Sequence, residues 1–452
     1  MGDLAQRRAR CFGTRMRSLL IFLSLLAANP VAADPVPIDE TGFPSHGAEE
    51  VELGKLLFYD PILSGNRSVS CATCHHPRFA TGDGIALGLG DGGVGLGPDR
   101  QADPENLPEQ RIPRNAPALF NTGHRDVTVM FADGRIEADP DRPSGLRTPL
   151  EEEMVAGFDN LLSAQTMFPV LSPDEMAGHY QENDVAKAVR QGRLTGDGGA
   201  WDIIAGRVAD IPEYRTRFAA AYPDIASGGR IAFTDISNAI SAFVSAEWRS
   251  DDSAFDRHLR GEGALEDEAL AGMELFFGDA GCASCHDGPF LSDQEFHAMG
   301  APQLGPGKAE RFESHQRDVG RMRVTGRTED AYAFRTPMLR NVTRTGPWGH
   351  AGGHADLREF LRDHAEPLAA SDRYTPDVAL PPLAGAKPDW AIWSDPKERG
   401  AILSAVKRQP HPLDERVLDA LMAFLAALDD ETALSGRMGI PETVPSGLPI
   451  DR

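Results

Sequence analysis

The sequence predicts a mainly α-helical protein with long loops, built from two copies of one helical unit. Apolar residues recur at helical spacing at Ile236 and Ile240, and again at Val417, Leu421 and Leu425. No segment shows the alternation of a convincing strand. The 46 glycines and 34 prolines among 452 residues favour long ordered loops between the helices.

The same periodicity predicts further helices, in chain order, over residues 51–58, 185–190, 203–208, 214–221 and 270–277. The first and last of these contain the similar stretches Leu53-Gly54-Lys55-Leu56-Leu57-Phe58 and Gly272-Met273-Glu274-Leu275-Phe276-Phe277. A Gly-rich break at 227–229 separates the two halves. We therefore expect one domain over residues 34–229 and a second over residues 230–452.

The N-terminus has the layout of a secretory signal peptide. Five arginines precede an apolar run over residues 19–28, and Val31-Ala32-Ala33 supplies the small residues of a cleavage site. The run of about ten residues is too short to cross a bilayer core of roughly 30 Å. We expect cleavage near Ala33, export to the periplasm, and no membrane span in the mature protein; a retained membrane anchor is the alternative, which no second apolar stretch supports.

The charge of the chain excludes one large class of partners. Its formal net charge is −23, and no cluster of Lys and Arg interrupts this acidic balance after the signal segment. Such a surface repels phosphate backbones, so nucleic-acid binding is not expected.

The cysteines carry the most specific chemical signal. Outside the signal segment, all four lie in two C-x-x-C-H motifs, Cys71-Ala72-Thr73-Cys74-His75 and Cys282-Ala283-Ser284-Cys285-His286. This is the pattern of covalent c-type haem attachment, in which both thiols form thioethers and the following His binds the iron. The sequence therefore predicts two cytochrome c-like helical haem domains.

Other interpretations of these patterns are less favoured. A zinc site would normally keep its two halves closer together in sequence, and a thioredoxin-like pair would follow a strand. Two local disulfides would leave the repeated His unexplained. The run Gly88-Leu89-Gly90-Asp91-Gly92-Gly93 matches a dinucleotide-binding pattern, but no βαβ unit surrounds it, so we expect a loop over the first haem.

The chain resembles the bacterial dihaem cytochrome c peroxidase family, which includes the protein-modifying enzyme MauG. The resemblance covers most of residues 48–430. The motifs that carry it are, in order, Leu53-Gly54-Lys55-Leu56-Leu57-Phe58-Tyr59-Asp60-Pro61-Ile62-Leu63-Ser64, Pro113-Arg114-Asn115-Ala116-Pro117, Asp133-Gly134-Arg135, Phe334-Arg335-Thr336-Pro337-Met338-Leu339-Arg340-Asn341-Val342 and Gly346-Pro347-Trp348-Gly349-His350.

The resemblance implies a division of labour between the two haems. The haem on His75 corresponds to the peroxidatic one, and the haem on His286 to the electron-transfer one. Gln165 and Glu175 stand at the spacing of the family's distal pocket residues. A carboxylate there can take a proton from bound peroxide and return it to the leaving oxygen.

The family also implies a calcium ion between the haem domains. The matching positions are the side chain of Asn115 and the carbonyl oxygens of Thr345 and Pro347, all of them donors that suit a hard cation. Asn115 could equally be an ordinary turn residue.

Three departures from the family pattern affect the expected chemistry. Residues 77–112 contain no His that could cap the first iron at rest, so that iron is expected to be open, as in MauG. The family's inter-haem Trp falls on Ala132. The sixth ligand of the second haem falls on His364, where the family has Met or Tyr; a surface His is the alternative.

These features predict an exported peroxidase that reduces hydrogen peroxide with electrons from a small redox protein, such as a cytochrome c or a cupredoxin. The first alternative is a MauG-like oxidase that uses peroxide to modify Trp or Tyr of a protein partner. The second is a non-enzymatic dihaem electron carrier, although a carrier needs no acid–base group such as Glu175. The sequence leaves a homodimer open.

Overall fold

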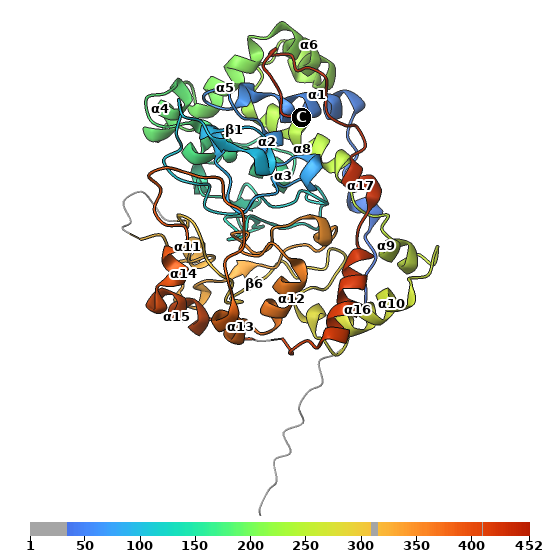
Figure 1. The fold of residues 1–452 in the computed structure, drawn as a ribbon. Helices are drawn as coiled ribbons and strands as arrows, with labels where there is room; N and C mark the ends of the chain where they lie inside the picture. Colours follow the sequence, from blue (N-terminus) through green and yellow to red (C-terminus); the bar gives the residue numbers. More distant parts are fainter. Residues whose placement is uncertain (1–33, 309–314, 409) are drawn as a thin grey trace, which may run out of the picture. The chain divides into compact units, whose positions relative to one another are not determined.

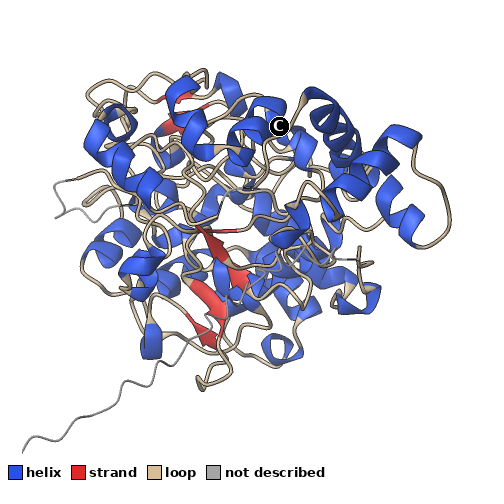
Figure 2. Ribbon diagram, turned by 90° about the horizontal axis from the view of Figure 1, so that it is seen from below, coloured by secondary structure: helices blue, strands red, loops and turns tan. Residues whose placement is uncertain are grey.

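The computed structural model describes residues 34–308, 315–408 and 410–452. The predicted signal peptide and its cleavage site at Ala33 lie outside these residues. Helices joined by long loops dominate the described chain, as Figure 2 shows. The predicted mainly α-helical class is confirmed.

The described α-helices include every helix expected from periodicity. Their bounds are α1 Ala48–Tyr59, α2 Cys71–Cys74, α3 Leu161–Thr166, α4 Asp184–Arg190, α5 Ala200–Ala209, α6 Pro212–Ala221, α7 Pro223–Ala226, α8 Phe233–Glu247, α9 Ala254–Leu259, α10 Asp267–Phe277, α11 Met322–Thr325, α12 Leu357–Ala365, α13 Pro367–Arg373, α14 Ala391–Ser394, α15 Pro396–Ser404, α16 Glu415–Ala426 and α17 Glu431–Ser435.

Three small antiparallel sheets were not expected. The first sheet pairs β1 Gly93–Val94 with β2 Gln101–Ala102. The second has the strand order β3 Val129–Met130, β4 Ile136–Ala138, β5 Leu146–Arg147. The third pairs β6 Phe296–His297 with β7 Phe334–Arg335. The expectation of no strands was wrong because strands of two or three residues are too short to show alternation in sequence.

Two equivalent helix crossings organise the structure (Figure 1). A Cβ on Gly54 of α1 would lie 1.8 Å from the carbonyl oxygen of Ala239 in α8, and a Cβ on Gly272 of α10 would lie 1.9 Å from that of Ala420 in α16. Only glycine permits backbones to approach this closely. The two sequence stretches that precede the C-x-x-C-H motifs therefore perform the same packing task in both halves.

Each crossing belongs to its own hydrophobic core. The first core contains α1, α3, α5 and α8 with Tyr59, Phe243 and Trp248 at its centre, and the second contains α10 and α16 around Phe276 and Phe424. These buried aromatic side chains remove large apolar areas from water and dominate the stability of each core.

The two cores do not divide the chain at residue 229. Helix α8, which follows that position, packs in the first core, and so do Val444 and Leu448 from the C-terminal tail. The tail is also hydrogen-bonded to the first half: Ser446 Oγ donates to Asp60 at 2.6 Å and Thr73 Oγ1 to Asp451 at 2.5 Å. A boundary between residues 229 and 230 would assign α8 and the C-terminal tail to the second domain, although both pack in the first core.

No described helix is long and apolar enough to cross a membrane.

Candidate active site

The first C-x-x-C-H motif forms a single helical turn that presents its histidine. Ser70 and Thr73 cap the turn of α2, and the His75 backbone N–H donates to the Cys71 carbonyl at 2.9 Å. His75 Nδ1 lies 2.9 Å from the Thr81 carbonyl oxygen. A hydrogen bond at Nδ1 fixes the ring and leaves Nε2 available to a metal.

The second motif repeats this geometry. A 3-10 turn spans Cys282–Ser284, and the His286 N–H donates to the Cys282 carbonyl at 2.9 Å. His286 Nδ1 lies 3.0 Å from the Leu291 carbonyl oxygen, which again leaves Nε2 available. Two motifs far apart in sequence thus hold their histidines in the same manner.

The cysteines fit thioether attachment better than the rival uses. All four are unpaired, so no disulfide joins them. The two motifs lie in separate hydrophobic cores, Cys71 in the first and Cys282 in the second, so the four thiols do not come together as a zinc site would require.

One group of three metal-binding side chains occurs within the described residues, and it includes a thiol of the second motif. Cys285, Asp293 and His297 lie close together, and His297 Nε2 is 2.8 Å from Asp293 Oδ2. A thioether at Cys285 would remove the thiolate that a metal ion needs there.

His364, on α12, faces His286. The centroids of their rings are 6.3 Å apart. A metal–imidazole bond is about 2 Å long and a ring nitrogen lies about 1 Å from its ring centre, so two histidines on opposite sides of one metal ion have centroids about 6 Å apart. Burial lowers the pKa of His364 to about 4, which keeps the ring in the neutral form that binds metals.

Three side chains that the sequence offers in place of His364 are engaged elsewhere. His350 stacks on Phe334 at 3.8 Å, and His354 Nε2 lies 3.1 Å from a carboxylate oxygen of Asp363. Met338 packs against the first hydrophobic core.

The surroundings of Arg335 fit an anionic group. Its guanidinium contacts the carbonyl oxygens of Phe131 and Thr336 at 3.3 and 3.4 Å and forms no ion pair with a carboxylate in the described chain. Burial lowers its pKa to about 10. A propionate of a haem would supply the charge that this arginine lacks.

Glu175 lies in a π-helical turn, Pro173–Ala177, beside the first motif. Such turns occur frequently at functional sites. The Gly-rich loop presses against this turn, since a Cβ on Gly90 would lie 1.8 Å from the Asp174 carbonyl oxygen. Burial, the Asp83 carboxylate and the Glu175 carboxylate together raise the pKa of Cys74 to about 12, so Glu175 acts on the first motif.

Gln165 is half-buried in α3, and no hydrogen bond joins it to Glu175 among the described residues. His124, the nearest histidine after residue 112, is not free to cap the first iron: its Nε2 lies 2.8 Å from the Asp39 carbonyl oxygen. Glu175 thus lies within electrostatic range of Cys74, and the ring of His124 is held by the Asp39 carbonyl oxygen.

Sequence reasoning missed Lys308 and Asp83. Burial lowers the pKa of Lys308, and nearby charges that act on its ammonium include Arg135 and Glu175. Burial also raises the pKa of Asp83 to about 7. No motif in the sequence marked either residue.

The residues implied for calcium lie on adjacent segments. The Asn115 N–H donates to the His350 carbonyl at 3.0 Å, and Asn115 Nδ2 donates to Ile85 and Ala86 at 2.8 and 3.2 Å. This leaves the side-chain oxygen of Asn115 for another partner. Thr345 and Pro347 belong to the segment that ends at His350.

The segment around Ala132 joins the two halves through charges. The Ala132 carbonyl accepts from the Arg335 N–H at 2.8 Å. Next to it, Arg114 contacts Asp318 through Nε at 2.7 Å and Asp133 through Nη1 at 2.8 Å, all three side chains being buried. Asp318 lies far along the chain from Arg114, so this ion network bridges distant segments.

Two helical cores, each with a C-x-x-C-H turn that offers a histidine, define a c-type dihaem protein. The family model of di-haem cytochrome c peroxidases matches residues 48–264. MauG, the methylamine utilization protein of Methylorubrum extorquens, is 30% identical over 319 residues, covering 70% of this chain and 68% of that protein. The chain belongs to the di-haem cytochrome c peroxidase family and is a peroxidase-type oxidoreductase. The family implies two haem c groups.

Further relatives and structures agree. The cytochrome c551 peroxidase of Nitrosomonas europaea is 28% identical over 359 residues, covering 76% of this chain and 83% of that protein. The crystal structure of a MauG-like protein associated with microbial copper homeostasis has a TM-score of 0.56 and 27% identity, covering 90% and 96% of the two chains. The diheme peroxidase BthA from Burkholderia thailandensis shares the fold, with a TM-score of 0.55, 21% identity, and coverage of 93% and 94%.

We expect two covalently attached haems in each mature chain, because the two motifs use all four cysteines outside residues 1–33. Intact mass spectrometry, after expression in cells competent for cytochrome c assembly, should show the mass of two haems that acidified organic solvent does not extract. A gain of one haem only would contradict the assignment of one motif.

We expect His364→Ala to convert one low-spin haem to a high-spin or water-ligated state, because the ring opposite His286 is lost. Optical and spin-resonance spectra of the oxidised holoprotein provide the measurement. His354→Ala is the matched control, since this ring lies in the same pocket and is held by Asp363. An unchanged low-spin signal in His364→Ala would show that another residue is the ligand.

Proposed function

We propose that this protein is an exported peroxidase that reduces hydrogen peroxide to water at the haem held by His75. His286 and His364 would hold the second haem, which would accept electrons from a small redox protein such as a cytochrome c or a cupredoxin. The haem irons supply the redox chemistry: peroxide takes up two electrons and two protons and yields two waters.

The position of Glu175 carries this proposal. Its carboxylate lies on a π-turn against the Gly-rich loop and within electrostatic range of Cys74. In this role Glu175 accepts a proton from one peroxide oxygen and returns it to the departing oxygen. An electron carrier has no use for such a group, and family membership also argues against that alternative.

A MauG-like oxidase is the second candidate, and two observations favour it. Residues 77–112 offer no histidine to close the first pocket, and the residue opposite His286 is a histidine instead of a methionine. A His ligand lowers the potential of a haem relative to Met. This suits an enzyme that retains oxidising power for a protein substrate.

Several finer assignments accompany the proposal. The protein is exported to the periplasm after cleavage near Ala33, and Asn115, Thr345 and Pro347 hold a calcium ion. The domain division expected from sequence is revised in one respect: α8 and the C-terminal tail belong to the first haem domain, although they follow residue 229. The packing of α8 and the tail in the first core supports this revision.

Rapid mixing of the fully oxidised holoprotein with hydrogen peroxide tests the proposal. We expect an immediate change in the haem spectrum, because residues 77–112 contain no histidine that could cap the first iron, followed by steady turnover when a reduced cytochrome c is added. If the haem spectrum changed only after the protein had first been reduced, the expectation that the first iron is open at rest would be contradicted. A fast reaction without turnover of any donor would favour the MauG-like alternative, which is then tested by mass analysis of periplasmic proteins for modified Trp or Tyr.

A further inference from the structure

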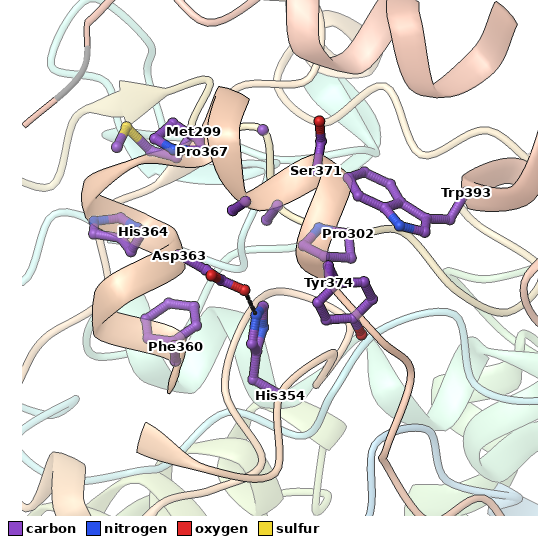
Figure 3. A pocket seen from close by; sticks show the side chains of 13 residues that line it. Met299, Pro302, His354, Phe360, Asp363, His364, Pro367, Ser371, Tyr374 and Trp393 are labelled. Carbon is purple, nitrogen blue, oxygen red and sulfur yellow. Dashed lines mark hydrogen bonds and ion pairs between the residues drawn. The ribbon is translucent and has the colours of Figure 1, made fainter. Parts of the chain in front are cut away.

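An aromatic cluster borders the pocket beside His364. Tyr374 follows α13, Trp393 lies on α14, and Trp390 directly precedes α14. These side chains pack around a small separate core that includes Ile392 and Ile402. Figure 3 shows His364 and Phe360 on one side of the pocket and Tyr374 and Trp393 on the other, with His354 between them.

The rings form a continuous path outward from His364. Phe360 stacks on His364 with centroids 5.4 Å apart, and the centroids of Phe360 and His354 are 5.3 Å apart. The ring of His354 is 4.9 Å from that of Tyr374. Each step is a direct ring contact of the kind that aromatic pairs prefer.

The path divides at Tyr374. Its ring centroid lies 5.9 Å from that of Trp390 and 5.8 Å from that of Trp393. Trp393 is buried, whereas Trp390 and Tyr374 are half-buried. The path therefore runs from the ligand His364 to side chains that solvent can reach.

Local contacts hold the rings in place. The Tyr374 hydroxyl donates to the Gly353 carbonyl. His354 Nε2 lies 3.1 Å from one oxygen of Asp363, and the other oxygen of Asp363 accepts from Arg373 Nε at 2.9 Å. Burial raises the pKa of Tyr374, so the phenol remains protonated and must lose a proton when it loses an electron.

We propose that Tyr374, Trp390 and Trp393 are an internal electron source and outlet for the second haem pocket. This inference rests on the proposed function, because it takes His364 as the haem ligand and peroxide as the oxidant. Tyrosine and tryptophan are the side chains that most readily give up a single electron, and mere packing of a small core would not require them. The chemical class of the final donor is an electron-rich protein or small molecule that reaches Tyr374 or Trp390.

The electron balance closes without a further reagent. In the absence of an external donor, one tyrosine and one tryptophan each lose one electron and one proton, and one hydrogen peroxide takes up both electrons and both protons to form two waters. The products on the protein are a neutral tyrosyl radical and a neutral tryptophanyl radical. An external donor then returns one electron, with a proton from water, to each of them.

The test treats the oxidised holoprotein with peroxide in the absence of a donor and freezes the sample for spin-resonance spectroscopy, while peroxide consumption is measured in parallel. We expect an organic-radical signal in the wild type and its loss in the triple variant Tyr374→Phe, Trp390→Phe, Trp393→Phe, which removes every proposed electron source. Tyr332→Phe is the matched control: Tyr332 packs against the same small core but has no ring contact with the path in the described chain. It should keep the signal.

Peptide mapping of the wild type gives a second measurement that does not depend on how the variants fold. After repeated peroxide additions, oxidised products should accumulate at Tyr374, Trp390 and Trp393, and not at Trp201 and Trp248 of the first core. Peroxide consumption with no radical, or with oxidation spread evenly over these sites, would overturn the inference alone. Absence of any peroxide reaction would overturn the proposed function together with it.

Discussion

Glu175→Gln should lower the rate of peroxide turnover by about two to four orders of magnitude, the usual contribution of a general acid–base group. The substitution is nearly isosteric and removes only the ability to take up and return a proton. Both haems should remain attached, because the four cysteines of the two C-x-x-C-H motifs are untouched. The measurement is the steady-state rate with a reduced cytochrome c as donor, normalised to haem content.

The neighbouring carboxylate on the same turn provides the control. Asp174 accepts a hydrogen bond from Gln110 at 2.8 Å. Asp174→Asn keeps an oxygen that can accept this bond, so turnover should remain near the wild-type rate. Equal rates in Glu175→Gln and the wild type would show that Glu175 only shapes the turn, and that another group moves the proton.

Arg114→Met should reduce the free energy of unfolding by about 3–5 kcal/mol, the usual effect of removing one partner from a buried ion pair. Arg114 lies between the buried carboxylates of Asp133 and Asp318. Burial alone would raise the pKa values of both carboxyl groups. Instead, the positive charges of Arg135 and Arg114 hold the pKa of Asp133 below its usual range, and Arg114 does the same for the pKa of Asp318. Without Arg114, two carboxylates remain buried with too little positive charge.

The pH dependence separates this explanation from a simple packing defect. In the wild type, lowered aspartate pKa values contribute stability that is fully present at neutral pH and is lost as the pH falls through those values. In the variant, the charge of Arg114 no longer opposes the effect of burial, so the pKa values of Asp133 and Asp318 rise. As the pH falls, these two carboxylates become protonated and no longer repel each other. The difference in stability between variant and wild type should therefore be largest near neutral pH and smaller in mild acid.

Denaturant unfolding of the holoprotein, followed by circular dichroism at several pH values, measures both effects. Arg125→Met is the control, because Arg125 is 59% exposed and its pairs with Asp39 and Asp126 lie at the surface. Such pairs contribute about 0–1 kcal/mol. A loss in Arg114→Met no larger than in Arg125→Met would contradict the assigned role of the buried network.

The helices that precede the C-x-x-C-H motifs were predictable because their signals are local. The apolar spacing of residues 51–58 and 270–277 lies within single helices, and the observed α1 and α10 extend it by a few residues at the ends. The reason for glycine in both helices was not predictable. Gly54 and Gly272 each meet a backbone carbonyl of a helix far along the chain, and only the packed structure shows these approaches.

The domain division illustrates where composition misleads. The Gly-rich stretch at residues 227–229 is a reasonable linker, but in the structure it is an exposed turn within the first half. The return of the C-terminal tail to Asp60 and Thr73 depends on contacts across most of the chain. No local sequence pattern predicts these contacts, because the residues that form them, Ser, Thr and Asp, are common at any surface position.

The sequence by itself determined the two haem attachment motifs, the helical class and the peroxidase family, because five contiguous residues specify the covalent chemistry and each helix follows from spacing within one segment. Only the tertiary structure decided that His364 faces His286, that Arg114 joins Asp133 to Asp318, and that a path of rings connects His364 to Tyr374. These pairings depend on how separate segments pack in three dimensions. Distances between side chains from different segments are a property of that packing, which no local pattern of residues encodes.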